Sequence, residues 1–262
     1  MSATRIAAVM RRHWIVLRRA PHRWFEISFW PVMDVVLWGS VGAFVAQESP
    51  DARAGTPYLL AGLVMFWTFT QAQFAIALGV NEETWTRNIL NVMTTPLREF
   101  EYIVGIALFG LLKLALCLVT LTITTIAFFG FDMSSVGWGV IPIMVLLVLN
   151  GWALAMLTVG LVLRFGQSAE ILIWGLNYAL LAFSGVFFPA DALPDGIRPI
   201  ASILPTTKAF AALHTLLAGD PLPWDTLAAS LAGTVVFFAA TISLATWLLG
   251  LFRRRGFVTR YS

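Results

Sequence analysis

The stretch YIVGIALFGLLKLALCLVTLTITTIAFFG, residues 102–130, decides the fold, because its 29 residues contain one charged side chain, Lys113. An α-helix rises about 1.5 Å per residue, and the hydrocarbon core of a bilayer is about 30 Å thick. A helix of this length spans a membrane with residues to spare, so it is expected to tilt or to project from the bilayer.

Further apolar runs lie on both sides of this stretch. The sequence has 262 residues, 59% of them hydrophobic and 12% charged, whereas soluble domains average about 45–50% and about 25%. This composition excludes an ordinary soluble enzyme and a disordered chain. We predict one all-α, polytopic membrane domain over residues 1–262. Its six transmembrane helices are expected at residues 25–46, 58–80, 102–130, 140–163, 171–189 and 226–251.

Positive charge is divided unequally between the two sides of these spans. Thirteen of the 17 Lys and Arg residues fall on one side, and only Arg53, Arg198 and Lys208 fall on the other. Cytoplasmic loops keep positive charge during insertion, so both termini are predicted to be cytoplasmic. An even number of spans agrees with this orientation. We expect no cleaved signal peptide, because no long apolar run precedes residue 25.

Residues 3–22 are predicted to form an amphipathic interface helix along the cytoplasmic membrane surface. At 100° per residue, Ile6, Val9, His13 and Leu17 share one face, and five arginines share the other. The positive-inside rule alone would account for the arginines. It does not account for the coherent apolar stripe, which favours the interface helix.

The segment 81–98 between the second and third spans is predicted to contain a short cytoplasmic helix. Asn81 can cap it, Glu82 and Glu83 favour its first turn, and Pro96 marks its end. Because acidic side chains disfavour contact with anionic lipid, we expect a docking surface for a protein partner; a helix resting on headgroups is the alternative. The candidate contact residues are Glu82, Glu83, Arg87, Leu90, Met93 and Pro96.

The external segment 190–223 is rich in proline yet strongly apolar. Pro194 and Pro205 can begin helices, and Gly219 can end one, so two short re-entrant helices are expected. Irregular backbone at membrane depth is tolerated only against protein or a cavity, so this segment is expected to line or close a pathway. A purely structural lid is the alternative.

The sequence lacks the residue patterns that ATP hydrolysis, metal binding or proteolysis would require. Neither lysine lies in a glycine-rich phosphate loop, so ATP hydrolysis is not expected here. His13, His22 and His214 have no partner at metal-ligand spacing. An intramembrane serine protease would need a histidine in a span, and no predicted span contains one. We therefore predict no catalytic residue, no metal site and no bound cofactor.

Three ionisable residues, Glu26, Asp34 and Lys113, fall inside predicted spans. Asp34 and Lys113 lie at similar depth, so they are expected either to form an ion pair or to face a hydrated pathway separately. Aromatic residues of the spans are candidates for lining a pathway, although each could equally face lipid. These are Trp38, Phe66, Trp67, Phe69, Trp152, Trp174, Phe187 and Phe188.

Three stretches together resemble the permease subunit of the ABC type-2 transporter family. They are FWPVMDVVLWG at 29–39, TWTRNILNVMTTPLREFEYIVG at 84–105, and FSGVFFPADALPDGIRPIASILPTTKAF at 183–210 with its LLAG ending. The resemblance implies an interface helix, a coupling helix at 81–98 and external re-entrant helices. It also implies two permease copies and two separate ATPase subunits. The family often has glycine at the start of the coupling loop, whereas Thr84 and Trp85 stand here.

The expected function is that of an ATP-driven exporter subunit in a bacterial or archaeal cytoplasmic membrane, which moves an amphipathic drug, lipid or glycan. ATP and Mg are expected on the partner subunit, the second permease is a copy or close paralogue, and nucleic acid is not a partner. The alternative is a secondary transporter or channel driven by an ion gradient, which would use the intramembrane ionisable residues as a relay.

Overall fold

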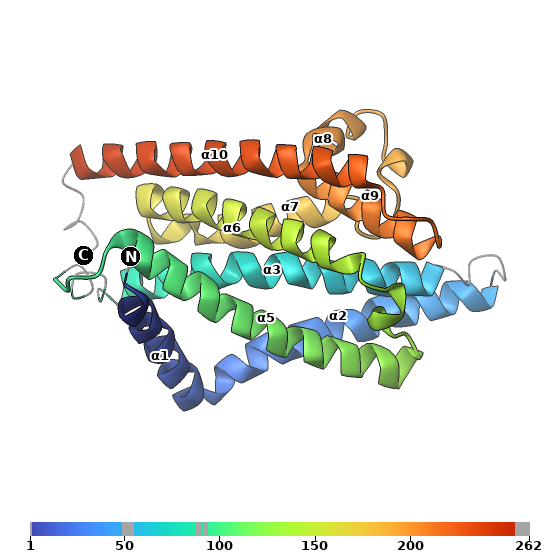
Figure 1. Cartoon of the computed structure of the whole chain (residues 1–262), viewed down its shortest axis with the longest axis horizontal. Helices are drawn as coiled ribbons and strands as arrows, with labels where there is room; N and C mark the ends of the chain where they lie inside the picture. The colour runs from blue at the N-terminus through green and yellow to red at the C-terminus, as the bar shows by residue number, and fades with distance from the viewer. Residues whose placement is uncertain (1, 49–54, 87, 89–90, 92–93, 255–262) are drawn as a thin grey trace.

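The computed structural model describes residues 2–48, 55–86, 88, 91 and 94–254, and every regular element within these ranges is a helix. Long helices lie side by side in one bundle, with short helices at one end (Figure 1). The α-helices are α1 (Ala3–Arg19), α2 (Pro21–Glu48), α3 (Gly55–Trp85), α5 (Glu99–Phe129), α6 (Val140–Phe165), α7 (Ile171–Phe183), α8 (Arg198–Ile203), α9 (Pro205–Leu217) and α10 (Trp224–Arg254). The 3-10 helices are η2 (Met133–Val136), η3 (Gln167–Glu170) and η4 (Ala190–Ala192).

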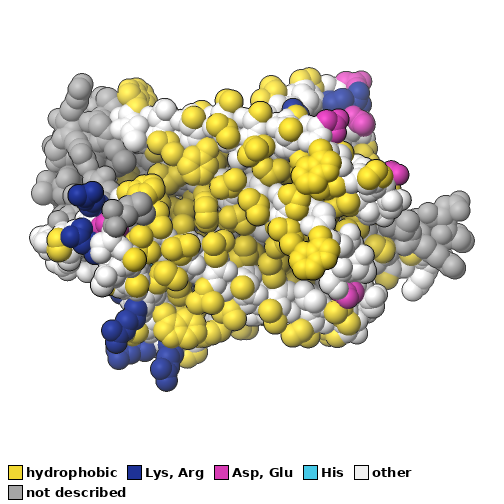
Figure 2. All heavy atoms as spheres, in the orientation of Figure 1, with side chains coloured by type: hydrophobic (Ala, Val, Ile, Leu, Met, Phe, Trp, Pro, Cys, Tyr) yellow, Lys and Arg dark blue, Asp and Glu magenta, His cyan; other side chains and the backbone are white. Residues whose placement is uncertain are grey.

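Five helices of the described chain, α2, α3, α5, α6 and α10, are long and apolar enough to cross a membrane. Hydrophobic side chains cover the middle of the face in Figure 2, whereas the charged side chains gather toward its two ends. An apolar band between charged ends is what a bilayer requires of a spanning protein. The chain is therefore a multi-pass membrane protein.

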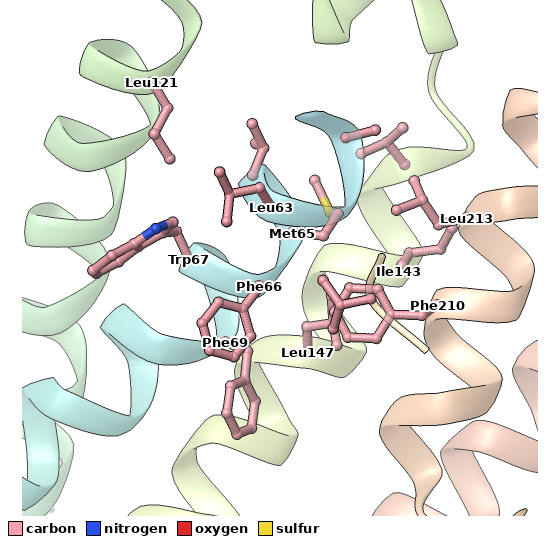
Figure 3. Packing of buried hydrophobic residues seen from close by; sticks show 14 of the residues in the cluster. Leu63, Met65, Phe66, Trp67, Phe69, Leu121, Ile143, Leu147, Phe210 and Leu213 are labelled. Carbon is pink, nitrogen blue, oxygen red and sulfur yellow. The ribbon is translucent and has the colours of Figure 1, made fainter. Parts of the chain in front are cut away.

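Helix α3 forms the centre of the bundle. Every residue from Leu60 to Ala77 is buried, because α3 carries apolar side chains on every face and a helix of that kind must be covered all round. Figure 3 shows Phe66 and Phe69 of α3 near Leu147 of α6 and Phe210 of α9. The core is thus built around one helix rather than between two layers.

Small residues allow the closest contact in this core. A Cβ atom on Gly151 of α6 would lie 2.5 Å from the carbonyl oxygen of Phe69 and 3.0 Å from the Cβ of Ala72. Membrane helices approach closely where a residue lacks a side chain, since van der Waals contact drives their association. Gly151 therefore sets the distance between α3 and α6.

The predicted fifth span, 171–189, is represented by a shorter helix. Helix α7 has 13 residues and ends at Phe183, which gives it a length of about 20 Å. The chain turns at Ser184 and Gly185, and Gly185 has a φ of 68° that favours glycine. The predicted helical continuation to Pro189 is therefore wrong.

The segment 190–223 contains short helices, as expected. Helix α9 begins at Pro205, where the sequence predicted a helix start. Gly219 follows the end of α9 with a φ of 87°. Ser230 of α10 donates a hydrogen bond to the carbonyl of Pro205 at 2.8 Å. This contact fixes the start of α9 against the first turns of α10.

Helix α3 is longer than the predicted span 58–80. It continues through Trp85, so Asn81 is a buried residue inside α3 and does not cap a new helix. The predicted start of the helix at 81–98 is therefore wrong. Apolar packing around Val80 continues the helix beyond the apolar run, and this packing is not visible in a hydropathy pattern.

Candidate functional site

A cluster of ion pairs, which we call the α1 junction, joins α1 and the start of α2 to the end of α3 and the start of α5. Its pairs are Arg5 with Glu101, Arg12 with Glu83, and Arg23 with Glu82. The paired residues are 96, 71 and 59 positions apart in the chain. The α1 junction therefore fastens the N-terminal helix to two long helices of the bundle.

Glu101 is the most buried member of the α1 junction, with 1% of its surface exposed. Its carboxylate accepts hydrogen bonds from the backbone N–H of Ser2 at 2.8 Å and from that of Arg98 at 3.2 Å. Arg5 Nη1 donates a third at 3.3 Å. A carboxylate in the first turn of a helix also interacts favourably with the helix dipole. Glu101 thus caps α5 and holds the start of α1.

Helix α1 follows the first turns of α5 in register. Arg5 meets Glu101, and His13 stacks on Phe109 with ring centroids 5.6 Å apart. Between them, a Cβ atom on Gly105 would lie 2.7 Å from the Cβ of Val9. The predicted apolar stripe of α1 is confirmed as its buried face, but this face packs against α5 rather than against lipid.

The acidic residues around 81–101 have partners within the chain that the sequence analysis did not name. Glu82, Glu83 and Glu101 bind arginines of the same chain, and the docking surface for a protein partner stays a prediction. Five arginines share the predicted polar face of the interface helix, and two of them, Arg5 and Arg12, are counter-ions of Glu101 and Glu83. Arg87, Leu90, Met93 and the side chain of Glu99 lie outside the described residues.

A pocket of about 270 Å³ lies between α1 and the chain that precedes α5. Pro96, one of the predicted contact residues, is exposed and lines this pocket. The other lining residues are Arg5, Ala8, Val9, Arg12, Thr95, Leu97 and Tyr102. The α1 junction therefore adjoins the described end of the segment 81–98.

The intramembrane carboxylate of Asp34 has a partner that sequence reasoning did not name. Asp34 Oδ2 accepts a hydrogen bond from Trp67 Nε1 at 3.1 Å, which links α2 to α3. The ion pairs between described side chains are four, and none joins Asp34 to Lys113. The side chain of Glu26 lies outside the described residues.

The predicted pathway aromatics fall into two groups. Phe66, Trp67 and Phe69 are buried in the core, because α3 is enclosed by its neighbours, and their place in a pathway stays a prediction. The others are at least partly exposed. These are Trp38, which stacks on Phe187 at 4.4 Å, Trp174, which contacts Phe74, and the partly exposed Trp152 and Phe188.

The model of one family, described as ABC-2 family transporter protein, matches residues 45–247. This match covers α3 to α10 almost completely. The chain belongs to the ABC-2 transporter family. No curated protein matches it. As an ABC-2 membrane domain, it is a permease component of a transport system, and the resemblance found in the sequence is confirmed.

Two polar contacts of this ABC-2 permease escaped the sequence analysis. Asn177 Nδ2 of α7 donates to Gln73 Oε1 of α3 at 2.5 Å, and Gln73 Nε2 donates to the carbonyl of Ile173 at 3.0 Å. Tyr58 of α3 and His214 of α9 share a hydrogen bond of 2.6 Å, and their rings stack at 3.8 Å. Polar residues inside apolar runs were the available signal for both contacts.

The burial of His214 predicts a pH dependence of stability. Burial lowers the pKa of His214 to about 4, so between that value and about 6.5 the unfolded chain binds more protons than the folded one. The thermal midpoint of the ABC-2 permease should therefore fall as the pH drops below about 6.5, and the contribution of His214 to this fall should be complete below about 4. His214→Gln should reduce this fall.

The control for this experiment is His22→Gln, because His22 is exposed. It should leave the pH profile unchanged. Burial also lowers the pKa of His13, so part of the fall should persist in the His214 variant. Identical profiles for wild type and His214→Gln, measured by thermal unfolding in detergent, would show that His214 does not titrate as the structure implies.

Proposed function

We propose that the chain is the permease subunit of an ATP-driven exporter that moves an amphipathic compound, a drug, lipid or glycan, out across the cytoplasmic membrane of a bacterium or archaeon. The observation that carries the proposal is the ABC-2 family match over residues 45–247. Two copies of a separate ATPase subunit would hold ATP and Mg, and the permease itself would bind no cofactor. Transport would involve no covalent chemistry on this chain.

The proposed topology has six membrane crossings with both termini in the cytoplasm. Helix α6 ends and α10 begins at opposite ends of the bundle, so the chain between them has to cross it, and α7 lies along that course (Figure 1). Its length of 13 residues suits a crossing completed by η3 and by the turn at Gly185. Helices α8 and α9 would then form the external re-entrant segment.

The proposed contact with the ATPase is the segment 81–98. Its ends are anchored by the α1 junction, since Glu82 and Glu83 lie at its start and Glu101 follows it. A force applied to this segment would move α1, α3 and α5 together, because the ion pairs and the packing of Val9 on Gly105 join them. This arrangement supports a coupling role without requiring a surface of acidic side chains.

The second permease copy is proposed because one chain offers one such segment to two ATPase subunits. Gly39 and Ala43 in α2 have the spacing of a close helix contact between copies. Gly39, however, packs on the ring of Phe129 within the same chain, where an added Cβ would meet Phe129 carbons. The motif therefore serves packing inside the protomer, and the copies would meet elsewhere.

The proposal is tested by placing a charge in the coupling segment. Leu90→Asp and Met93→Asp should leave ATP hydrolysis running and reduce transport at least tenfold, because an apolar contact would be lost. Asn91→Asp adds the same charge at an exposed position of the same segment and is the matched control. The readout is transport and ATPase activity of the reconstituted complex, with native mass spectrometry expected to give two permeases and two ATPases.

Unchanged transport in both aspartate variants would refute the coupling role of the segment. Transport that needs an ion gradient and no ATPase subunit would refute the exporter and support the alternative, a secondary transporter.

A further inference from the structure

Asp34 is a carboxylate in the middle of a membrane span that its own protomer does not fully bury. It lies near the centre of the 28-residue helix α2 and is half-buried. A charged group exposed to hydrocarbon is costly, so such residues face protein, water or a ligand. The hydrogen bond from Trp67 Nε1 satisfies one of its two oxygens. The face of α2 that carries Asp34 is therefore expected to lie along a pathway or a subunit contact rather than against lipid.

Aromatic residues lie on the same face of α2 as this carboxylate. Trp30 and Trp38 lie one helical turn before and after Asp34, because residues four apart share a helix face. Trp30 is 56% exposed, and Trp38 is held by its stacking on Phe187. Tyr178 of α7 is 58% exposed and lies within electrostatic range of Asp34. Two long helices and α7 thus bring indole and phenol rings to a single acidic group.

A carboxylate among aromatic rings is suited to one chemical class. The faces of tryptophan and tyrosine attract cations, and recognition of organic ammonium groups uses aromatic rings in this way. The same environment repels an anion, and a neutral hydrogen-bond donor gains less from the carboxylate than a cation does. Trp67 fixes the carboxylate by donating to one oxygen, which leaves the other available to a cationic group.

We propose that Asp34, with Trp30, Trp38 and Tyr178, recognises a lipophilic organic cation and that the exported compound belongs to this class. The role of this site in transport rests on the proposed function. Asp34 supplies the charge, the three aromatic residues supply the faces that contact the cation, and Trp67 is a positioning residue.

The experiment is equilibrium binding of tetraphenylphosphonium to the full-length permease in nanodiscs without nucleotide, corrected with empty nanodiscs. Saturable binding is expected for wild type. Asp34→Asn, which keeps an oxygen for Trp67, should raise the Kd at least tenfold. Asp132→Asn removes a carboxylate outside the spans and should not change the Kd. Tetraphenylborate, of the same shape and opposite charge, should show no binding that depends on Asp34.

The aromatic contribution is tested separately. Trp38→Ala should raise the Kd severalfold, whereas Trp138→Ala should not, because Trp138 is 86% exposed in the turn before α6. Thermal midpoints and the oligomeric state are measured for every variant, so that a misfolded protein is recognised. Asp34→Glu keeps the charge and should restore binding to within a few-fold of wild type if Asp34→Asn fails only for lack of charge.

Equal tetraphenylphosphonium binding by wild type and Asp34→Asn would overturn the proposal. A changed oligomeric state of Asp34→Asn at unchanged affinity would also overturn it and would make Asp34 a subunit contact. The binding assay contains no ATPase, so it is independent of the coupling test. Cation binding by a permease that fails the coupling test would support the binding site and contradict the exporter function.

Discussion

Replacing Gly151 by alanine is expected to lower the free energy of unfolding by about 2–3 kcal/mol, because the added methyl group meets backbone that cannot rotate away. The new Cβ would lie 2.5 Å from the carbonyl oxygen of Phe69 and 3.1 Å from the backbone N of Gln73. Helices α3 and α6 would have to separate along the centre of the core. Thermal unfolding in detergent, together with the yield of folded protein, measures the effect.

Gly175→Ala is the matched control for this change. Gly175 also lies in a helix, but a Cβ there would meet no atom within 4 Å. Alanine is a better helix former than glycine by about 1 kcal/mol, so this variant should be as stable as wild type or more stable. Equal midpoints for the two alanine variants would show that α3 and α6 are not in the contact that the structure describes.

Replacing Arg12 by methionine should be the most damaging change in the α1 junction, at about 2–3 kcal/mol. Its partner Glu83 has a side chain only 7% exposed, so the change leaves a buried carboxylate without its counter-ion. Breaking a fully buried pair costs about 3–5 kcal/mol. We expect a smaller loss for Arg12→Met than for a fully buried pair, because Arg12 is 42% exposed and Asn88 still donates to Glu83. Thermal unfolding at neutral pH is the measurement.

Arg11→Met is the control, since Arg11 is the neighbouring exposed arginine of α1. It should change stability by less than about 0.5 kcal/mol, as surface substitutions usually do. The double variant Arg12→Met with Glu83→Gln should recover much of the loss, because it removes the buried charge. A double variant as unstable as Arg12→Met alone would assign the loss to packing of the arginine side chain.

The sequence predicted the helical class, the central parts of the long spans and the start of α9, because each depends on local hydropathy or on proline. The helix boundaries that were predicted incorrectly depend on packing. Helix α3 passes its apolar run to reach Trp85, and α7 stops at Phe183 where Ser184 and Gly185 turn the chain. In both places, contacts with distant helices decide where the helix ends.

The candidate site could be predicted in part. The sequence placed Glu82 and Glu83 at the start of the segment that we propose contacts the ATPase, but it did not name their arginine partners, since no periodicity reveals that Arg12 and Arg23 lie against them. Asp34 was recognised as unusual from composition alone. Its hydrogen bond to Trp67 required the structure, because the two residues lie on different helices.

Helix α3 also makes a mechanical connection across the whole molecule. Tyr58 near its start bonds to His214 of α9, and Glu83 near its end bonds to Arg12 of α1. Its 31 residues extend about 46 Å, and its only proline, Pro57, lies in the first turn. A continuous helix of this kind would transmit a shift at the α1 junction directly to α9 at the other end of α3, without a relay of side chains.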